Sequence, residues 1–346
     1  MPETTIVVTG VSGMLGQRLL PLLDARSDVA QIVGLDVHDP ARRVGKLTMH
    51  RVDVAASELK RVLEGVDVVV HLATLGDPIQ DPDLMERVNV DGTRRLLDAA
   101  AAVGVTRVVR VSSAAVYGAW PDNPVPLTED APLRPSPGYQ PAAHDAECER
   151  LLAEWEAGIP GASTVVLRVA PVVGSGEGMS LLARCAIGRA PIAVRDSARP
   201  VQVVHVDDAA NALVLAVTGG LTGVYNVSAD SWLDSAAAVD LVGARRFPAL
   251  PAEIAERVLA ALWSSGLGEA PPTILPYLVN PWVVANDRIV AAGFTPRYTN
   301  EEAIVLASPG AAGSSVGWIA ASAAILAGVV GATVWSRRRH ARGGRS

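Results

Sequence analysis

Three glycines near the start of the chain have the spacing of a phosphate-binding turn. The segment TGVSGMLG places Gly10, Gly13 and Gly16 after a β-rich run and at the start of a stretch with helical spacing. Glycine permits a tight turn and lets backbone N–H groups approach a pyrophosphate at the positive end of the helix. Asp36 ends the next predicted strand, where its carboxylate can accept hydrogen bonds from ribose hydroxyls. The pattern predicts a dinucleotide site.

The same segment favours NAD as the cofactor. The Asp36 carboxylate would repel the 2′-phosphate of NADP, whereas Arg42 and Arg43 nearby leave NADP open as the alternative. We expect the residues between the glycines to line the cofactor as well, namely Ser12, Met14 and Leu15.

Composition narrows the functional classes. A chain of 346 residues can form one large or two ordinary domains, and its 49% hydrophobic content argues against a disordered protein. The net charge of −6 gives no electrostatic reason to expect nucleic acid as a partner. Cys148 and Cys185 lack metal-ligand spacing and the histidines are scattered, so we expect two reduced core thiols and no bound metal.

Strand and helix patterns alternate along the first half of the chain. Apolar runs at 4–10, 31–36, 47–54, 66–73 and 105–118 predict strands, and the segments 13–26, 58–65 and 83–104 predict helices. Strands separated by helices imply βαβ units and a doubly wound parallel sheet, so the predicted fold class is α/β of the Rossmann type. Further strands are expected at 163–174, 200–205 and 223–228, and further helices at 141–157 and after 205.

The second half of the chain suggests a smaller domain over one edge of that sheet. A proline-rich surface loop covers 118–138, and residues 232–305 are helical in pattern but broken by proline. We divide the chain into a nucleotide-binding domain, 1–171 completed by 201–228, and a substrate domain, 172–200 with 229–305. Residues 306–315 are interpreted as a linker.

The C-terminal segment has the composition of a membrane span. Residues 316–335 carry no charge, have Trp318 and Trp335 near their ends, and precede a basic tail at 336–346. No signal peptide is expected, which favours a cytoplasmic catalytic domain anchored by this helix, although the basic tail argues for the opposite orientation. The alternative is an alanine-rich helix packed against protein.

Seven motifs occur in the order typical of extended short-chain dehydrogenases/reductases: TGVSGMLG, RVDV, HLAT, NVDGT, VSSAAVYG, LRVAPVVG and VVHVDDAANAL. Over residues 4–305 the chain resembles an NAD-dependent epimerase/dehydratase family protein of actinobacterial type. The resemblance implies that Asp53 and Val54 flank the adenine, and that Leu72 and Ala73, with His71, lie beneath the cofactor. Asn89 would brace the central helix against the sheet. Family members commonly dimerise, which implies a possible homodimer here.

The resemblance also implies the catalytic residues. Ser113 occupies the position of the catalytic serine or threonine, with capping of a strand end as the alternative role. Tyr139 would be the catalytic tyrosine, which exchanges a proton with the substrate while a hydride moves to or from nicotinamide. His205 and Asp207 would brace the two domains.

The lysine that normally accompanies the tyrosine is missing. An unperturbed tyrosine has a pKa of ~10, too high for an effective base at neutral pH, and the family lowers it with a lysine four residues on. That position is Ala143, and no Tyr-x-x-x-Lys occurs anywhere in the chain. His144 is adjacent but rotated by ~100° on a regular helix, so it remains open as a partial substitute.

Two functional interpretations follow, and a third, weaker one is a non-redox protein that uses the fold to bind another nucleotide ligand. In the first, the chain is an NAD-using oxidoreductase or nucleotide-sugar epimerase/dehydratase that works with Ser113 and Tyr139 in an altered site. In the second, it is a catalytically inactive NAD-binding module tethered to the membrane. The substrate cannot be identified from the sequence.

Overall fold

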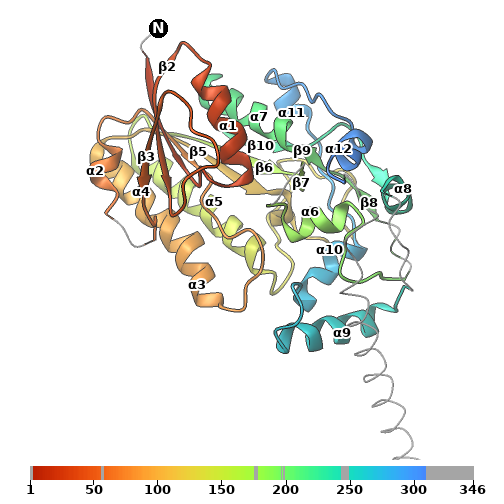
Figure 1. Cartoon of the computed structure of the whole chain (residues 1–346). Helices are drawn as coiled ribbons and strands as arrows, with labels where there is room; N and C mark the ends of the chain where they lie inside the picture. Colours follow the sequence, from red (N-terminus) through yellow and green to blue (C-terminus); the bar gives the residue numbers. More distant parts are fainter. Residues whose placement is uncertain are drawn as a thin grey trace, which may run out of the picture.

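A seven-stranded parallel sheet forms the centre of the molecule (Figure 1). The computed structural model describes residues 3–55, 58–174, 178–195, 197, 199–242 and 249–308. The strand order is β10-β6-β5-β4-β1-β2-β3, so the direction of winding reverses between β1 and β4, as expected for a doubly wound sheet. The strands are β1 (Thr4–Thr9), β2 (Val29–Asp36), β3 (Leu47–Arg51), β4 (Val68–His71), β5 (Arg107–Ser113), β6 (Ser163–Val169) and β10 (Gly223–Val227).

Helices cover both faces of the sheet (Figure 1). On one face lie α1 (Met14–Asp24) and α7 (Val206–Thr218), and on the other α2 (Lys60–Leu63), α4 (Gly92–Val103) and α5 (Gln140–Gly158). Successive side chains of β1 alternate between the two cores: Ile6 packs with α1, and Val7 packs with the α4 side. Burial on both faces explains why these strands are continuously apolar in the sequence.

Three predicted elements differ locally from the structure. The helix expected at 83–104 is divided into α3 (Pro82–Glu86), the π-helical turn η1 (Arg87–Asp91) and α4, which ends at Gly104 with φ 81°. The strand expected at 105–118 ends at Ser113 and continues as the 3-10 turn η2 (Ala114–Tyr117). Helix α5 begins at Gln140, so Pro141 is the second helical residue, where a missing N–H still costs no intrahelical hydrogen bond.

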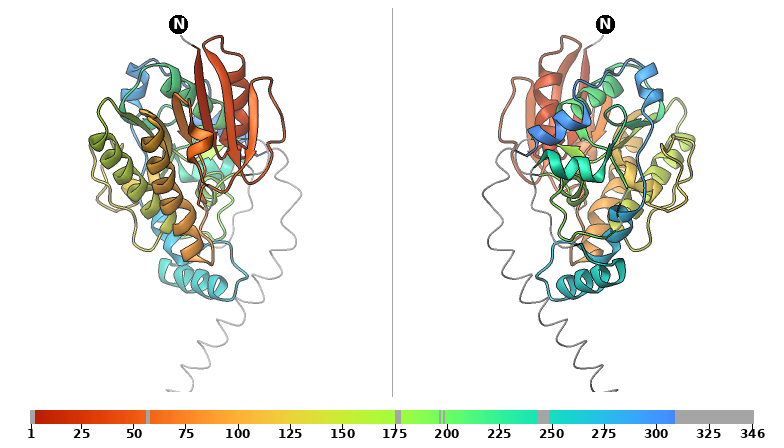
Figure 2. Two further views of the ribbon diagram at one scale, coloured as in Figure 1. Left: turned by 90° about the vertical axis from the view of Figure 1, so that its left-hand side faces the viewer. Right: turned by 90° about the vertical axis from the view of Figure 1, so that its right-hand side faces the viewer.

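Most of the remaining elements pack beyond the carboxyl ends of the strands, whereas Ile289 and Phe294 join the core that α1 and α7 form on one face of the sheet. Figures 1 and 2 show α9 at the end of the molecule opposite the N-terminus. Tyr139, Leu181 and Tyr277 share one buried apolar cluster with these elements, and both cysteines are buried and unpaired. The elements are β7 (Val172–Val173), α6 (Leu181–Ala186), β8 (Pro200–Val201), β9 (Val204–His205), β11 (Leu233–Asp234), α8 (Ser235–Leu241), α9 (Ala252–Ser264), η3 (Pro272–Ile274), α10 (Leu275–Val279), α11 (Asp287–Ala291) and α12 (Asn300–Leu306).

The predicted membrane span cannot be placed in this fold. Within the described ranges, none of the helices has both the length and the apolar character needed to cross a bilayer. The span predicted at 316–335 and the basic tail at 336–346 lie outside the described residues.

Candidate functional site

The glycine turn after β1 is built by close backbone packing. Gly10 has φ 70°, and a Cβ there would lie 2.7 Å from the backbone nitrogen of Ala73. A Cβ on Gly16 would lie 2.6 Å from the carbonyl oxygen of Gly10. Gly13 is the N-cap of α1 and brings no side chain to its first turn. The N–H groups at the start of α1 therefore have no side-chain cap, which suits an anionic group such as pyrophosphate.

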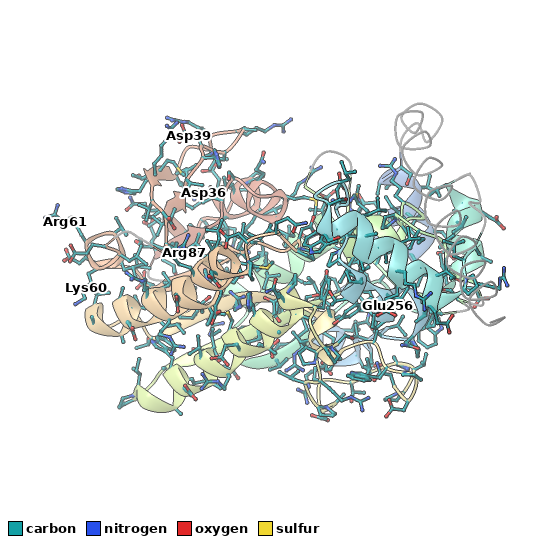
Figure 3. All side chains as sticks on the ribbon, turned by 90° about the horizontal axis from the view of Figure 1, so that it is seen from below. Asp36, Asp39, Lys60, Arg61, Arg87 and Glu256 are labelled. Carbon is teal, nitrogen blue, oxygen red and sulfur yellow. The ribbon has the colours of Figure 1, made fainter. Side chains whose placement is uncertain are left out.

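Asp36 stands directly beside this turn. Its Oδ2 accepts hydrogen bonds from the backbone N–H of Ser12 at 2.9 Å and from the Ser12 hydroxyl at 2.6 Å, while Oδ1 accepts from the backbone N–H of His38 at 3.0 Å. Asp36 and Asp39 lie on the same side of the molecule in Figure 3. The Asp39 carboxylate forms an ion pair with Arg43 at 3.8 Å, so one of the two arginines that favoured NADP already has an acidic neighbour.

The end of β4 is fixed from below by a buried histidine. The Thr93 hydroxyl donates to the carbonyl of Asn89 at 2.6 Å, so its oxygen accepts from the Nε2–H of His71 at 2.9 Å. The Thr9 hydroxyl then donates to His71 Nδ1 at 2.8 Å and accepts from both backbone N–H groups that follow His71. Burial and the nearby positive charge of Arg110 lower the pKa of His71 well below its usual range, so the ring is neutral.

The other predicted cofactor residues differ in how directly the structure connects them to the glycine turn. The Asn89 side chain accepts from the backbone N–H of Leu75 at 2.7 Å and donates to its carbonyl at 3.1 Å, which holds the loop after β4. Met14 and Leu15 are half-buried, and they pack against different cores. Asp53 is exposed and Val54 is buried at the end of β3, and within the described chain no hydrogen bond joins them to the glycine turn. The fold brings together the predicted residues Gly10, Ser12, Gly13, Gly16, Asp36, Leu72 and Ala73.

Ser113 and Tyr139 belong to two segments that Tyr277 connects. The Ser113 hydroxyl accepts from the backbone N–H of Ala115 at 3.1 Å and caps the turn η2. Tyr277 of α10 links the two segments, because its hydroxyl donates to the Ala115 carbonyl at 2.9 Å and its ring packs on Tyr139 with centroids 4.8 Å apart. No local pattern indicated Tyr277, which lies far from both segments along the chain.

The phenol of Tyr139 is withdrawn from water. Its residue is 1% exposed, and among the described residues its hydroxyl makes no hydrogen bond. Burial, reinforced by the negative charge of Asp77, raises the pKa of Tyr139 well above its usual range. Tyr139 is therefore a neutral phenol at physiological pH.

The position of the missing lysine is open to solvent. Ala143 is exposed, one turn after Tyr139 on α5. His144 is half-buried, and its Nδ1 is buried with no hydrogen-bond partner in the described part of the chain. Burial lowers the pKa of His144, and the neighbouring charge of Glu86 opposes this only partly. His144 therefore supplies no positive charge at neutral pH in place of the lysine.

A buried ion pair lies beneath this part of α5. Arg110 of β5 is 1% exposed and donates to the Asp145 carboxylate at 2.8 Å. Burial outweighs the attraction of Arg110 and raises the pKa of Asp145 to about 6. One feature of the sequence indicates this ion pair: Arg110 is a charged residue within a strand predicted to be buried on both faces, where it needs an acidic partner.

Comparisons with known proteins agree with this architecture. The family model described as "NAD dependent epimerase/dehydratase family" matches residues 6–228. A 3-diazoavenalumate denitrifying reductase from a Streptomyces species is 33% identical over 279 residues, which cover 73% of this chain and 86% of that protein. UDP-glucose 4-epimerase 4 of rice is 39% identical over 152 residues, 39% of this chain and 41% of that enzyme.

The fold has close matches among solved structures. UDP-glucose 4-epimerase of Thermus thermophilus, solved in complex with NAD, superposes with a TM-score of 0.68 at 25% identity, covering 90% of this chain and 100% of that one. The family match, the glycine turn and the doubly wound sheet lead to one conclusion. The chain belongs to the NAD-dependent epimerase/dehydratase family of extended short-chain dehydrogenases/reductases.

Proposed function

We propose that this protein is an NAD-dependent oxidoreductase that acts as a reductase, with Tyr139 as a neutral hydroxyl donor. One observation carries the proposal: the Tyr139 phenol is 1% exposed and no lysine follows it at Ala143. A neutral phenol can protonate an alkoxide, which is more basic than a phenolate, but it cannot remove a proton from an alcohol at neutral pH. Carbonyl reduction needs protonation of the alkoxide that forms. Epimerisation of a sugar alcohol begins instead with removal of the alcohol proton.

The residues of the glycine turn fit NAD. Gly10 and Gly16 let backbone segments pack where a Cβ would clash, the start of α1 carries no side-chain cap, and the Asp36 carboxylate suits ribose hydroxyls. NADH, when bound, supplies the hydride. The negative charge of Asp36 would repel the 2′-phosphate of NADP, so we expect NAD to bind more tightly than NADP.

The catalytic roles fall to two hydroxyl groups. Ser113, half-buried at the end of β5, would hydrogen-bond the carbonyl oxygen of the substrate and hold it near the phenol. Tyr139 would donate its proton to that oxygen as charge develops there, and the phenolate would regain a proton from solvent after the product has left the site. The ring of Tyr277, which packs on the ring of Tyr139, would hold the Tyr139 phenol in one orientation. The name of the Streptomyces relative, a reductase, is consistent with this direction.

The test is to follow NADH consumption by the purified chain with a panel of aldehydes, ketones and conjugated carbonyl compounds. Product analysis of UDP-glucose with NAD runs in parallel. We expect turnover of at least one carbonyl compound and no UDP-galactose. Tyr139→Phe and Ser113→Ala should each lower the rate by roughly 10²-fold, within the range of general acid catalysis. Epimerisation by the wild type, or a rate that Tyr139→Phe leaves unchanged, would contradict the proposal.

A second candidate is an NAD-binding module without turnover. Tyr139 is enclosed in the apolar cluster with Leu181 and Tyr277. This enclosure favours the module, because it hinders the access to the phenol that a substrate would need. Calorimetric titration with NAD, combined with the carbonyl panel, separates the two candidates. Tight NAD binding without any NADH consumption would support the module.

The domain division and the membrane anchor are also proposals. The apolar composition of 316–335 and the adjacent basic tail support a tether near the membrane, and residues 229–305 would form most of the substrate domain. Cell fractionation of the full chain and of a chain ending at residue 308 tests the tether. Recovery of both in the same fraction would contradict it. Cross-linking tests the homodimer.

A further inference from the structure

The Tyr139 phenol is covered by two segments that lie far apart in the chain. Leu181 and Cys185 of α6 belong to the buried apolar cluster that contains Tyr139. Asp77, in the loop after β4, lies near the same side chain: burial chiefly raises the pKa of Tyr139, and the negative charge of Asp77 adds to this shift. Because Tyr139 is 1% exposed, a substrate reaches its hydroxyl only if part of this cover moves.

Asp77 joins the two covering segments. Its Oδ1 accepts a hydrogen bond from the backbone N–H of Leu181, the first residue of α6, at 2.6 Å, and its Oδ2 pairs with Nη1 of Arg184 at 3.3 Å. Arg184 also donates to the carbonyl of Met179 at 2.9 Å and pairs with Glu269 at 3.5 Å. One carboxylate therefore binds both the start of α6 and the basic side chain one turn later.

The loop that carries Asp77 takes no part in the apolar core. Residues 74–80 belong to none of the buried apolar clusters of the described chain, whereas α6 contributes to two of them. At the far end of the loop the exposed Gln80 donates to the carbonyl of Trp263 at 2.9 Å. The loop can therefore separate from α6 without exposing an apolar cluster that it helps to form.

The contact between the loop and α6 is also open to water. The side chains of Asp77 and Arg184 are 37% and 30% exposed, so water and salt weaken their ion pair. Tyr277, which packs on the Tyr139 ring, is fully buried, and its hydroxyl donates to the carbonyl of Ala115 at 2.9 Å. Breaking that buried hydrogen bond would leave a polar group unsatisfied, which costs more than separating an exposed pair.

We propose that the contact of Asp77 with α6 is a latch over Tyr139, and that its opening admits the substrate to the phenol. The consequence for turnover rests on the proposed function, whereas the opening itself does not. Cys185 is a probe of the opening, because it is 5% exposed on α6 and the charges of Arg184 and Asp77 act on its thiol. Burial raises the pKa of Cys185 to about 12, so its thiol should react with a thiol reagent only when it is uncovered.

The experiment measures how fast each cysteine of the full chain is labelled by a thiol reagent, with mass spectrometry of the peptides as the readout. We expect Cys185 to react at least threefold faster in Arg184→Met and at least tenfold faster in Asp77→Ala, which loses both the ion pair and the hydrogen bond. The two substitutions change the charge near the thiol in opposite directions, so a shared acceleration cannot come from a changed thiol pKa. Arg189→Met is the matched control, because Arg189 is exposed just after α6, and it should leave the labelling rate unchanged.

Cys148 separates local opening from global unfolding. It is fully buried on α5 in a different apolar cluster, so its labelling rate should be the same in the wild type and in all variants. Labelling of Cys185 at the wild-type rate in both latch variants would overturn the proposal, as would an equal acceleration of both cysteines.

Turnover of a carbonyl substrate tests the consequence for access. In the latch variants kcat/KM should rise together with the labelling rate of Cys185. Faster labelling with an unchanged kcat/KM would overturn the claim that the latch controls access to Tyr139. Absence of any turnover would contradict the proposed function, and the labelling rates would still decide whether the latch opens.

Discussion

The glycine turn after β1 keeps the family pattern, whereas the start of α5 departs from it. At the turn, Gly10, Gly16 and Asp36 are all present, and each is held by backbone contacts that a substitution would disturb. At the start of α5, Tyr139 is present but its lysine is replaced by Ala143, and the phenol is enclosed by Tyr277. Binding geometry and acid–base chemistry are thus separable, because the first depends on backbone shape and the second on a single tuned pKa.

The largest effect is expected from filling the cofactor turn. Gly16→Ala places a Cβ 2.6 Å from backbone atoms of Gly10 and Val11, which cannot move as a flexible side chain would. We expect at least 10²-fold weaker NAD binding and a loss of stability of about 1–3 kcal/mol. Titration with NAD and denaturant unfolding measure both. Gly158→Ala is the control, since a Cβ there meets nothing within 4 Å. Undiminished NAD binding by Gly16→Ala would contradict the claim that the backbone shape of the glycine turn determines cofactor binding.

Restoring the lysine sharpens the comparison from the other side. Ala143 is exposed, so Ala143→Lys should change stability by less than about 0.5 kcal/mol. A positive charge one turn from Tyr139 would lower its pKa, and we expect oxidation of alcohols with NAD to rise by roughly 10–10²-fold. The pH–rate profile for oxidation should shift toward lower pH. Ala143→Met, which adds length without charge, should give no gain; an equal gain would show that charge is not the missing element.

Cofactor preference should change by a smaller factor. Asp36→Asn removes the negative charge next to the ribose while keeping the size of the side chain. We expect NAD affinity to fall by roughly tenfold and NADP affinity to increase, because a charged hydrogen bond is lost and a repulsion is relieved. Calorimetric titrations with both cofactors measure the ratio. A ratio that stays at the wild-type value would mean that Asp36 does not face the ribose.

The smallest effect is a pH dependence that originates beneath α5. The pKa of Asp145 is raised from 3.8 to about 6, so the folded protein holds this proton more tightly than the unfolded chain. Its contribution to stability is full below about pH 4 and is lost as pH rises through about 6. Between about pH 4.5 and 5.5 the free energy of unfolding should fall by about 1 kcal/mol from this group. Asp145→Asn should lack that slope, and identical slopes in both proteins would refute the assignment.

Much of the fold could be predicted because its signals are local. The continuous apolar strands and the helical spacing between them predicted a doubly wound sheet, and the seven-stranded parallel order confirms it. The boundaries that were missed are those set by distant contacts. The strand predicted to reach residue 118 ends at Ser113, where the chain turns into η2 under a hydrogen bond from Tyr277 to Ala115.

The sequence by itself determined the cofactor turn and the absence of the lysine, because both depend on residue types at fixed spacing along one segment. The tertiary structure alone decided how deeply Tyr139 is buried and that Arg110 meets Asp145 beneath it. It also left the Nε of Arg199 without a hydrogen-bond partner among the described residues. Burial and charge pairing are properties of segments far apart in the chain that pack together. The pKa of a phenol or the free charge of a guanidinium therefore depends on neighbours that no local pattern reveals.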